Sequence, residues 1–242
     1  MALQNLTLIA LRTVKHSDRL TILTAYSRES GRVSLSIPAG SSKGIARLNA
    51  MSMPLSLISG VADVKPGREI SPVRQLSIRH PLASLHGNPL KMMTAMFIAE
   101  TLAAVLRDND GDTHLFDFIE GAIRAFDLLD NPRGIANFHL WFLYRLAAML
   151  GIEPDNSTYT PGATFDTRDG LWRRSMPLHG QAITDDASRS IWLLSRMTLA
   201  NIHRYSYTRR QRNDLLDGII SYYTLHLINL SNLKTLPILR DL

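Results

Sequence analysis

Cysteine is absent from the 242-residue chain, which excludes disulfide bonds, a thiolate nucleophile and any zinc or iron–sulfur centre with cysteine ligands. Long apolar runs are also lacking, because no stretch reaches the roughly 18 continuous apolar residues that a membrane span needs. The opening hydrophobic run alternates with threonine and stops at Arg12, which is not the pattern of a signal peptide. We therefore expect a cytoplasmic protein with no membrane partner.

Signatures of catalysis are missing as well. The 8 histidines form no HExxH pair, and no nucleophile elbow, Walker A loop or dinucleotide-binding glycine pattern occurs. Asp108, Asp110 and Asp112 superficially resemble a calcium loop, but the glycine spacing is wrong for one, and capping of the next helix explains them better. A metal-dependent nuclease using these aspartates, or a scaffold that binds only protein, is the alternative to a non-enzymatic nucleic-acid-binding protein.

Positive charge is concentrated at the front of the chain. Residues 1–80 carry 11 Lys and Arg against 4 Asp and Glu, a net charge of +7, and the remainder carries 16 against 17, a net charge of −1. The total of +6 therefore belongs to the first third of the sequence. This asymmetry predicts two domains, 1–80 and 81–242, of which the first meets a polyanion.

The front of the sequence reads as β-strands separated by glycine and proline turns. Val33, Leu35 and Ile37, for example, alternate with polar residues at the period of a half-buried strand. Five strands within about 80 residues fit a small closed barrel, and the OB-fold is the barrel of this size that most often carries nucleic acid. The expected strands are 6–11, 20–26, 32–37, 51–64 and 69–80.

The rest of the sequence follows the period of helices. Asn88-Pro89 and Asn131-Pro132 each place an N-cap before a proline at the first helical position. Residues 153–181 are irregular and predict a small packed insertion with short strands. The fold class is therefore α+β, with an OB-fold barrel followed by an all-α domain that carries the insertion. The expected helices are 90–107, 113–129, 131–150, 184–197 and 211–230.

Two groups of basic residues are candidate DNA contacts. Those of the barrel stand at strand ends, turns and one loop, where they form a basic rim; the alternative is an ordinary solvated face with Asp18 and Glu29 as partial counterions. Those of the helical part are interleaved with Tyr205 and Tyr207, which either stack on bases or anchor the core. The candidates are Arg12, Lys15, Arg19, Arg28, Arg32, Lys43, Arg47, Arg204, Arg209, Arg210 and Arg212.

Three segments carry a resemblance to a known family. LIALRTVKHSDRLTILTAYSRESGRVSLSIPAGSSKG with the later LNAMSMPLSLI resembles the N-terminal OB domain of the bacterial recombination mediator RecO, and LINLSNLKTLPIL resembles the family's closing segment. PDNSTYTPGATFDTRDGLW is similar to the place where many members carry a small zinc knuckle. Because this chain has no cysteine, we expect the zinc to be absent and no cofactor to be bound, with Phe165 and Trp172 holding the knuckle by packing.

The resemblance implies a non-enzymatic DNA repair protein. Such a protein binds single- and double-stranded DNA, anneals complementary strands and, usually with RecR, helps to load the RecA recombinase onto strands coated by single-strand binding protein (SSB). By position, the basic residues of the barrel would be the DNA contacts, and the acidic and apolar C-terminal tail of SSB would bind the helical domain. The resemblance also implies that the protein acts at the bacterial nucleoid during repair.

Overall fold

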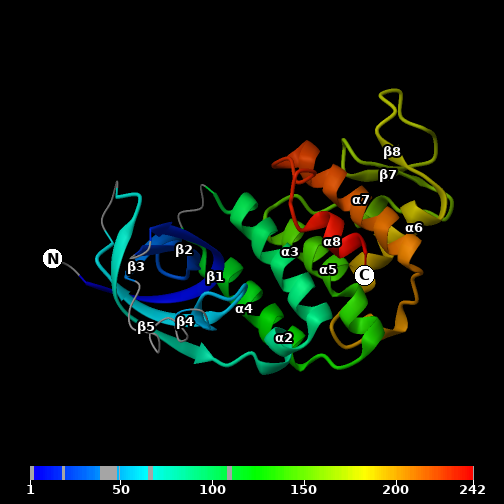
Figure 1. Cartoon of the computed structure of the whole chain (residues 1–242). Coiled ribbons are helices and arrows are strands. Elements are labelled where there is room, and N and C mark those ends of the chain that lie inside the picture. Colours follow the sequence, from blue (N-terminus) through cyan, green and yellow to red (C-terminus); the bar gives the residue numbers. More distant parts are fainter. Residues whose placement is uncertain are drawn as a thin grey trace. The chain divides into compact units, whose positions relative to one another are not determined.

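The structure is a computed structural model that describes residues 3–17, 20–38, 48, 50–64, 68–107 and 111–241, apart from the side chain of Asp185. The chain forms two compact units, Met1–Leu128 and Leu129–Leu242 (Figure 1). None of the helices in the described ranges combines the length and the apolar character that a transmembrane span requires. Each unit is described below by itself.

The first unit is built on a closed β-barrel with the strand order β1-β2-β3-β5-β4, in which β4 pairs back onto β1. Neighbouring strands are antiparallel except β3 and β5, which pair in parallel. The predicted OB-fold-like barrel is thereby confirmed. Its strands are β1 (Gln4–Ser17), β2 (Leu20–Ser27), β3 (Gly31–Pro38), β4 (Leu57–Ala62) and β5 (Ser71–His80).

Alternation of side chains decides what fills the barrel and what faces outward. Val33, Leu35 and Ile37 of β3 are buried in one hydrophobic cluster, as the sequence pattern predicts. The intervening polar residues of β3 are only partly buried and point the other way. The register between β1 and β2 shifts after Ala10, which leaves Leu11 as a bulge and bends β1. The outer side of β3 is consequently polar, whereas the outer side of β2 also carries Ile22 and Tyr26.

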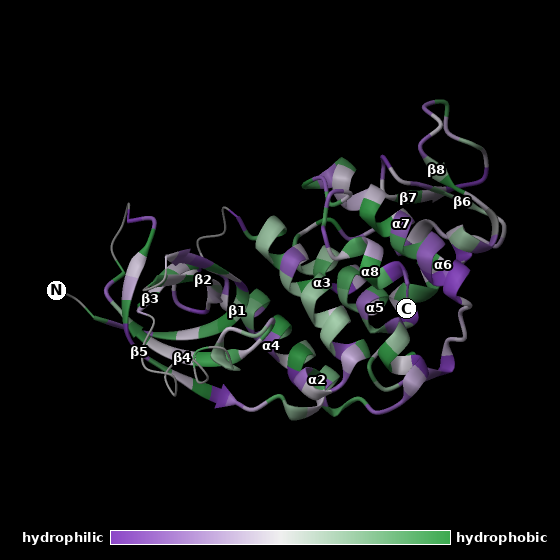
Figure 2. Ribbon diagram, viewed as in Figure 1, coloured by the Kyte–Doolittle hydropathy of each residue, from purple (hydrophilic) through white to green (hydrophobic). Residues whose placement is uncertain are grey.

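Helices α2 (Ala83–Gly87), α3 (Pro89–Val105) and α4 (Thr113–Leu128) complete the first unit. The predicted cap of α3 is confirmed, because Oδ1 of Asn88 accepts the backbone N–H groups of Leu90 and Lys91. Helix α3 packs on β1, and Phe116 of α4 stacks on Tyr26 of β2 with ring centroids 6.0 Å apart. In Figure 2, α3 is coloured largely as apolar, in keeping with a helix that packs on several sides.

The second unit is organised around α5 (Pro132–Met149), almost all of whose residues from Phe138 to Ala147 are buried. Tyr223 of α7 is buried and donates its hydroxyl to the carbonyl of Leu143, 2.8 Å away. Helix α6 presents a strongly hydrophilic side in Figure 2. The remaining elements are η1 (Asn156–Thr158), β6 (Thr164–Asp166), β7 (Leu171–Arg173), β8 (Ala182–Ile183), α6 (Asp185–Arg196), η2 (Ile202–Arg204), α7 (Arg209–His226) and α8 (Leu236–Arg240).

The expected strand and helix bounds differ from the structure most clearly at three places. The first strand, expected over 6–11, spans Gln4–Ser17, so Arg12 lies within β1 and not at a strand end or turn. The strand expected over 51–64 begins only at Leu57, because Leu55 takes a positive φ of 62° and donates its N–H to the carbonyl of Ala10. The last long helix starts at Arg209, since Thr208 and Gln211 form a capping box, and it ends at His226. The compact units divide after Leu128, whereas the predicted boundary at residue 80 follows the change from strands to helices.

Candidate nucleic-acid interface

Arg12 and Arg32 lie on the same outer side of the barrel. Arg12 of β1 is paired with Thr24 of β2, which is paired in turn with Ser34 of β3. Paired residues of antiparallel strands share a face, and Arg32 stands two residues before Ser34, so all four point away from the hydrophobic core. Two guanidinium groups thus flank two hydroxyl groups on a sheet surface. Such a set of donors suits phosphate oxygens.

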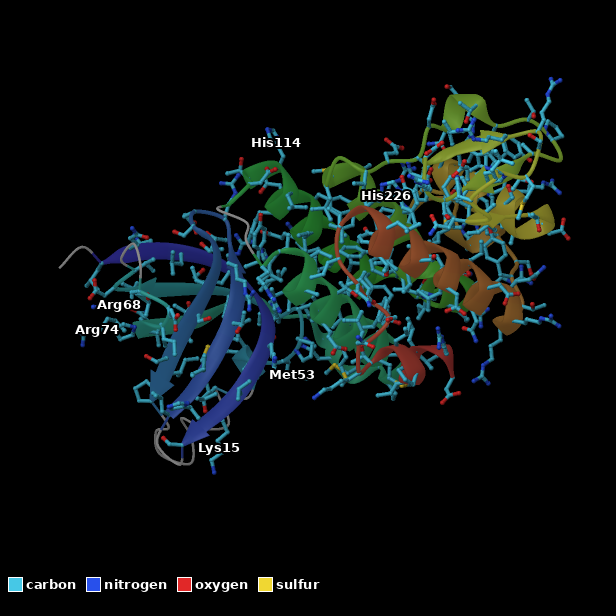
Figure 3. The ribbon with its side chains drawn as sticks, turned by 90° about the horizontal axis from the view of Figure 1, so that it is seen from above. Lys15, Met53, Arg68, Arg74, His114 and His226 are labelled. Carbon is cyan, nitrogen blue, oxygen red and sulfur yellow. The ribbon has the colours of Figure 1, made fainter. Side chains whose placement is uncertain are left out.

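Lys15 does not share that face. Lys15 pairs with Thr21, and Thr21 pairs with Ile37 of the core, so the side chain of Lys15 is on the inward side of the strand. Lys15 is nevertheless exposed, because it lies near the end of β1, beyond the packed core. Figure 3 shows Lys15 at the far end of the barrel from Arg68 and Arg74. Lys15 therefore belongs to the rim that the sequence predicts, although not to the surface that carries Arg12.

Arg28 is held in an ion pair with α4. Its Nε and Nη2 atoms donate to the two carboxylate oxygens of Asp117 at 3.0 and 2.9 Å. The hydrogen bond from Arg28 lowers the pKa of Asp117 below its ordinary value. The bidentate geometry fixes the guanidinium against α4, so the structure does not bring Arg28 together with Arg12. The remaining barrel candidates, Arg19, Lys43 and Arg47, lie outside the described residues and stay predictions.

Arg74 of β5 is a basic residue on the outer side that sequence reasoning missed. Val61 and Ala62 of β4 pair with Gln75 and Val73, so Arg74 is the extra residue of a bulge, and it is exposed. No regular alternation marks Arg74, because the bulge places the packed residues Val73 and Leu76 three positions apart. Nearby Arg68 is different, since it binds the buried carboxylate of Asp63 at 3.1 Å and has a structural role.

The four arginines of the helical part do not form one patch. Arg209 donates to the backbone carbonyl of Arg240 and to Asp241, at 2.8 and 2.7 Å, and so fastens α8 to the start of α7. Arg212 donates to the carbonyl of Tyr207 at 2.9 Å. Arg204 is exposed, and Arg210 is almost fully exposed with Asp214 4.0 Å away. Two of these candidates are therefore engaged within the unit, and two face solvent.

Arg212 also lines a cavity of about 200 Å³ at the start of α5. The buried amide of Asn137 shapes its wall by donating to the carbonyls of Ile202 and Tyr205 at 3.2 and 2.8 Å. The buried hydroxyl of Tyr207 has no hydrogen-bond partner among the described residues, and burial raises its pKa to about 12. The cavity is lined by Pro132, Arg133, Ala136, Asn137, Tyr205, Ser206, Tyr207 and Arg212. The two cations in this lining, Arg133 and Arg212, suit an anionic group.

The aspartates considered for a metal-dependent nuclease do not form a described metal site. Oδ1 of Asp112 accepts the N–H groups of His114 and Leu115, at 2.8 and 3.1 Å, and so caps α4. This is the capping role that the sequence favours. Asp108 and Asp110 lie outside the described residues.

Comparison with known proteins covers both units. Residues 1–82 match the family model described as "Recombination protein O N terminal", and residues 86–236 match "Recombination protein O C terminal". The chain is 33% identical over 234 residues to the DNA repair protein RecO of Phocaeicola vulgatus, covering 97% of this chain and 96% of the relative. It is 35% identical over 243 residues to RecO of Porphyromonas gingivalis, with the same coverage. RecO of Flavobacterium psychrophilum is 26% identical over 235 residues, covering 96% of each chain.

Proposed function

Because this chain belongs to the RecO family of DNA repair proteins, we propose that it is a recombination mediator without catalytic activity. In this proposal it binds single- and double-stranded DNA, anneals complementary strands and, with RecR, promotes the loading of RecA onto SSB-coated strands at the nucleoid. The observation that carries the DNA-binding part is the outer barrel surface on which Arg12 and Arg32 flank Thr24 and Ser34. Labelled DNA incubated with the protein and magnesium should accordingly stay intact.

Charge neutralisation supplies the mechanism. Guanidinium groups bind phosphates without regard to base sequence, so affinity falls with salt by a log–log slope of about −0.7 per phosphate contact on single strands. Annealing needs two strands held close together while their bases stay free to pair. A cationic sheet surface with short hydroxyl side chains reduces the repulsion between two backbones, and hydroxyl groups do not hold bases by stacking.

The double variant Arg12→Glu/Arg32→Glu tests the proposal. We expect at least about a tenfold loss of affinity for single-stranded oligonucleotides, with a salt slope shallower by about 1.4, because two phosphate contacts disappear. Fluorescence anisotropy at several salt concentrations measures both, and a strand-annealing assay should slow in parallel. Arg28 is left unchanged, because its reversal would place a glutamate beside Asp117.

The matched control is Arg124→Glu/Arg189→Glu, which changes the net charge equally at two exposed positions on helices α4 and α6. It should bind and anneal nearly as the wild type does, and both double variants should keep the wild-type melting temperature. Equal losses in the two double variants would mean that net charge, and not the barrel surface, determines binding. Unchanged annealing in Arg12→Glu/Arg32→Glu would reject the barrel surface.

For the SSB partner, we propose that the cavity at the start of α5 receives the acidic C-terminal tail. Arg133 is exposed at the cavity edge and occupies the second position of α5, where a glutamate is favourable to the helix dipole. Arg133→Glu should therefore fold normally and lose roughly tenfold or more in affinity for an SSB tail peptide, measured by anisotropy. Arg189→Glu is the control. Binding of free DNA should not change, and retained peptide affinity in Arg133→Glu would exclude this cavity.

A further inference from the structure

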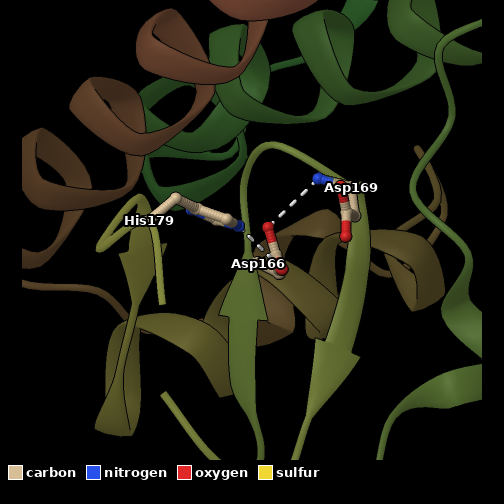
Figure 4. Close-up of side chains that lie close together, drawn as sticks. All are labelled: Asp166, Asp169 and His179. Carbon is tan, nitrogen blue, oxygen red and sulfur yellow. Dashed lines mark hydrogen bonds and ion pairs between the residues drawn. The ribbon is translucent and has the colours of Figure 1, made fainter. Parts of the chain in front are cut away.

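The insertion of the second unit is arranged around one buried carboxylate, that of Asp166 at the end of β6. Its Oδ1 atom accepts the backbone N–H groups of Arg168 and Asp169, at 3.1 and 3.0 Å. Its Oδ2 atom accepts a hydrogen bond from Nε of Arg173 at 2.8 Å. The same Oδ2 atom lies 3.3 Å from Nε2 of His179 (Figure 4). A carboxylate has about four lone-pair sites, so the acceptor capacity of Asp166 is filled.

The hydrogen bond at Nδ1 of His179 shows which ring nitrogen carries the proton. Nδ1 of His179 accepts the backbone N–H of Gln181 at 3.1 Å, so it carries no proton. The neutral ring therefore has its proton on Nε2, the atom that lies 3.3 Å from Oδ2 of Asp166. Both nitrogens of His179 are thus engaged, and neither has a free lone pair.

Arg173 joins two carboxylates. Its Nε atom binds Asp166, and its Nη2 atom forms an ion pair with Asp169. Burial alone would raise the pKa of Asp166, but the N–H of Asp169, the guanidinium of Arg173 and nearby His179 outweigh it, and the pKa is lowered. The negative charge of Asp166 is therefore stabilised by the chain itself, with no external cation required.

These contacts bear on the zinc that the family resemblance implies for this segment. Asp166, Asp169 and His179 are the described group with metal-ligand atoms within 4.8 Å of one another. Zinc needs an unprotonated imidazole nitrogen and carboxylate oxygens that can bind it, but Nδ1 of His179 already accepts a hydrogen bond, Asp166 is occupied by its donors, and Asp169 is paired with Arg173. An ion bound at about 2 Å from Oδ2 of Asp166 would also lie beside the Arg173 guanidinium and be repelled by it. The donor set does not fit the metal.

We propose that this insertion folds without metal, around a buried anion that accepts three hydrogen bonds and faces Nε2 of His179, in the segment that resembles the family's zinc knuckle. Arg173 and His179 stand directly before and after the five-residue segment 174–178 in the sequence. Because both contact Oδ2 of Asp166, this one carboxylate holds both ends of the segment. The segment presents Met176 and Leu178 to solvent. In this proposal the contacts of Asp166 hold the segment in that exposed conformation. The Phe165 and Trp172 rings, 4.6 Å apart, pack alongside the same centre.

The metal part is tested on the purified full-length chain. Elemental analysis should find much less than one zinc per chain, and neither a chelator nor added zinc chloride should move the melting temperature. One tightly bound zinc per chain, with a melting temperature that falls on chelation, would overturn the proposal.

The anion part is tested by Asp166→Asn against Asp169→Asn. The first places an amide NH₂ among four donors and should lower the melting temperature by roughly 5 °C or more, whereas the second loses one exposed ion pair and should shift it by about 1–2 °C. Thermolysin, which cuts before apolar residues, should cleave Asp166→Asn faster before Leu178. Equal stability and equal cleavage of the two variants would overturn the assignment of Asp166.

Arg173→Ala and Arg168→Ala provide a second pair in case Asp166→Asn fails to fold. Arg168 is an exposed arginine of the same turn and offers only its backbone N–H to Asp166. Faster cleavage of segment 174–178 in Arg173→Ala, with wild-type cleavage in Arg168→Ala, supports the proposal that Asp166 holds this segment through Arg173. Identical cleavage of both variants contradicts it.

Discussion

Acidification from pH 7 to pH 5 is expected to lower the free energy of unfolding by about 2 kcal/mol through one side chain, that of His139. His139 lies in α5 among the core residues of the second unit. Burial, together with the positive charge of Arg212, lowers its pKa from 6.5 to about 3. The folded chain therefore keeps this imidazole neutral over a range in which the unfolded chain protonates it.

The direction of this pH effect on the free energy of unfolding follows from the lowered pKa of His139. Above pH 6.5 the residue is neutral in both states and contributes no pH dependence. As the pH falls from 6.5 toward 3, proton uptake by the unfolded chain favours unfolding by about 1.4 kcal/mol for each pH unit. Below about pH 3 the folded chain binds the proton as well, and the loss stops increasing.

The variant His139→Gln isolates this effect. Glutamine stays neutral at every pH, so the variant should lose about 2 kcal/mol less than the wild type between pH 7 and pH 5, although it is less stable at pH 7. Urea unfolding at half-unit pH steps measures the difference. His203→Gln is the control, because His203 is exposed. Parallel stability curves for the wild type and His139→Gln would contradict the buried neutral imidazole.

Local sequence patterns predicted the barrel and the helix starts because these features depend on neighbours in sequence. The alternation of Val33, Leu35 and Ile37 is enough to assign an inner face, and Asn88 and Asn131 each cap a helix as expected. The packing of Phe165 on Trp172 was likewise predicted within one short segment and is confirmed.

The candidate site was harder to predict because the availability of a cation depends on distant partners. Arg28 is separated by 89 residues from Asp117, and Arg209 by 32 residues from Asp241. No local pattern shows that these ion pairs form. Clusters of basic residues therefore indicate where positive charge lies, whereas only the fold shows that Arg12 and Arg32 are on the same outer side of the barrel.

The same limit applies to the centre around Asp166. Its four donors come from a turn, a strand and a loop, and they do not have the regular spacing that makes cysteine ligands recognisable. The absence of cysteine predicted that zinc is missing but gave no sign of what holds the insertion. An Asp followed by backbone N–H groups two and three residues later is a common turn, and nothing local marks it as central.

Replacement of Lys91 by alanine is expected to lower the stability of the first unit by about 4 kcal/mol. Lys91 of α3 is almost completely buried, yet its ammonium group is well provided with acceptors. Nζ donates to Oγ of Ser84 at 2.7 Å and to the backbone carbonyl of Asp127 at 2.8 Å, and it lies 5.7 Å from the ring centre of Phe126. A single side chain thus connects α2, α3 and α4.

Two effects contribute to the expected loss. The carbonyl of Asp127 is in the last turn of α4, where carbonyls lack helical partners and the helix dipole is negative, so a buried cation is well placed there. Lys91→Ala leaves this carbonyl without its donor and opens a cavity where the aliphatic chain packed. The carboxylate of Asp127 caps α2 by accepting the N–H of Leu85 at 2.7 Å, so movement at the end of α4 also loosens α2.

Lys91→Met separates the two effects, because methionine fills most of the volume but donates no hydrogen bond. We expect Lys91→Ala to lower the melting temperature by roughly 10 °C and Lys91→Met by roughly 4 °C, with the exposed Arg124→Ala unchanged. Calorimetry on the full chain measures all three. If Lys91→Met is as stable as the wild type, packing alone explains the burial of this lysine, and its charge does not stabilise the end of α4.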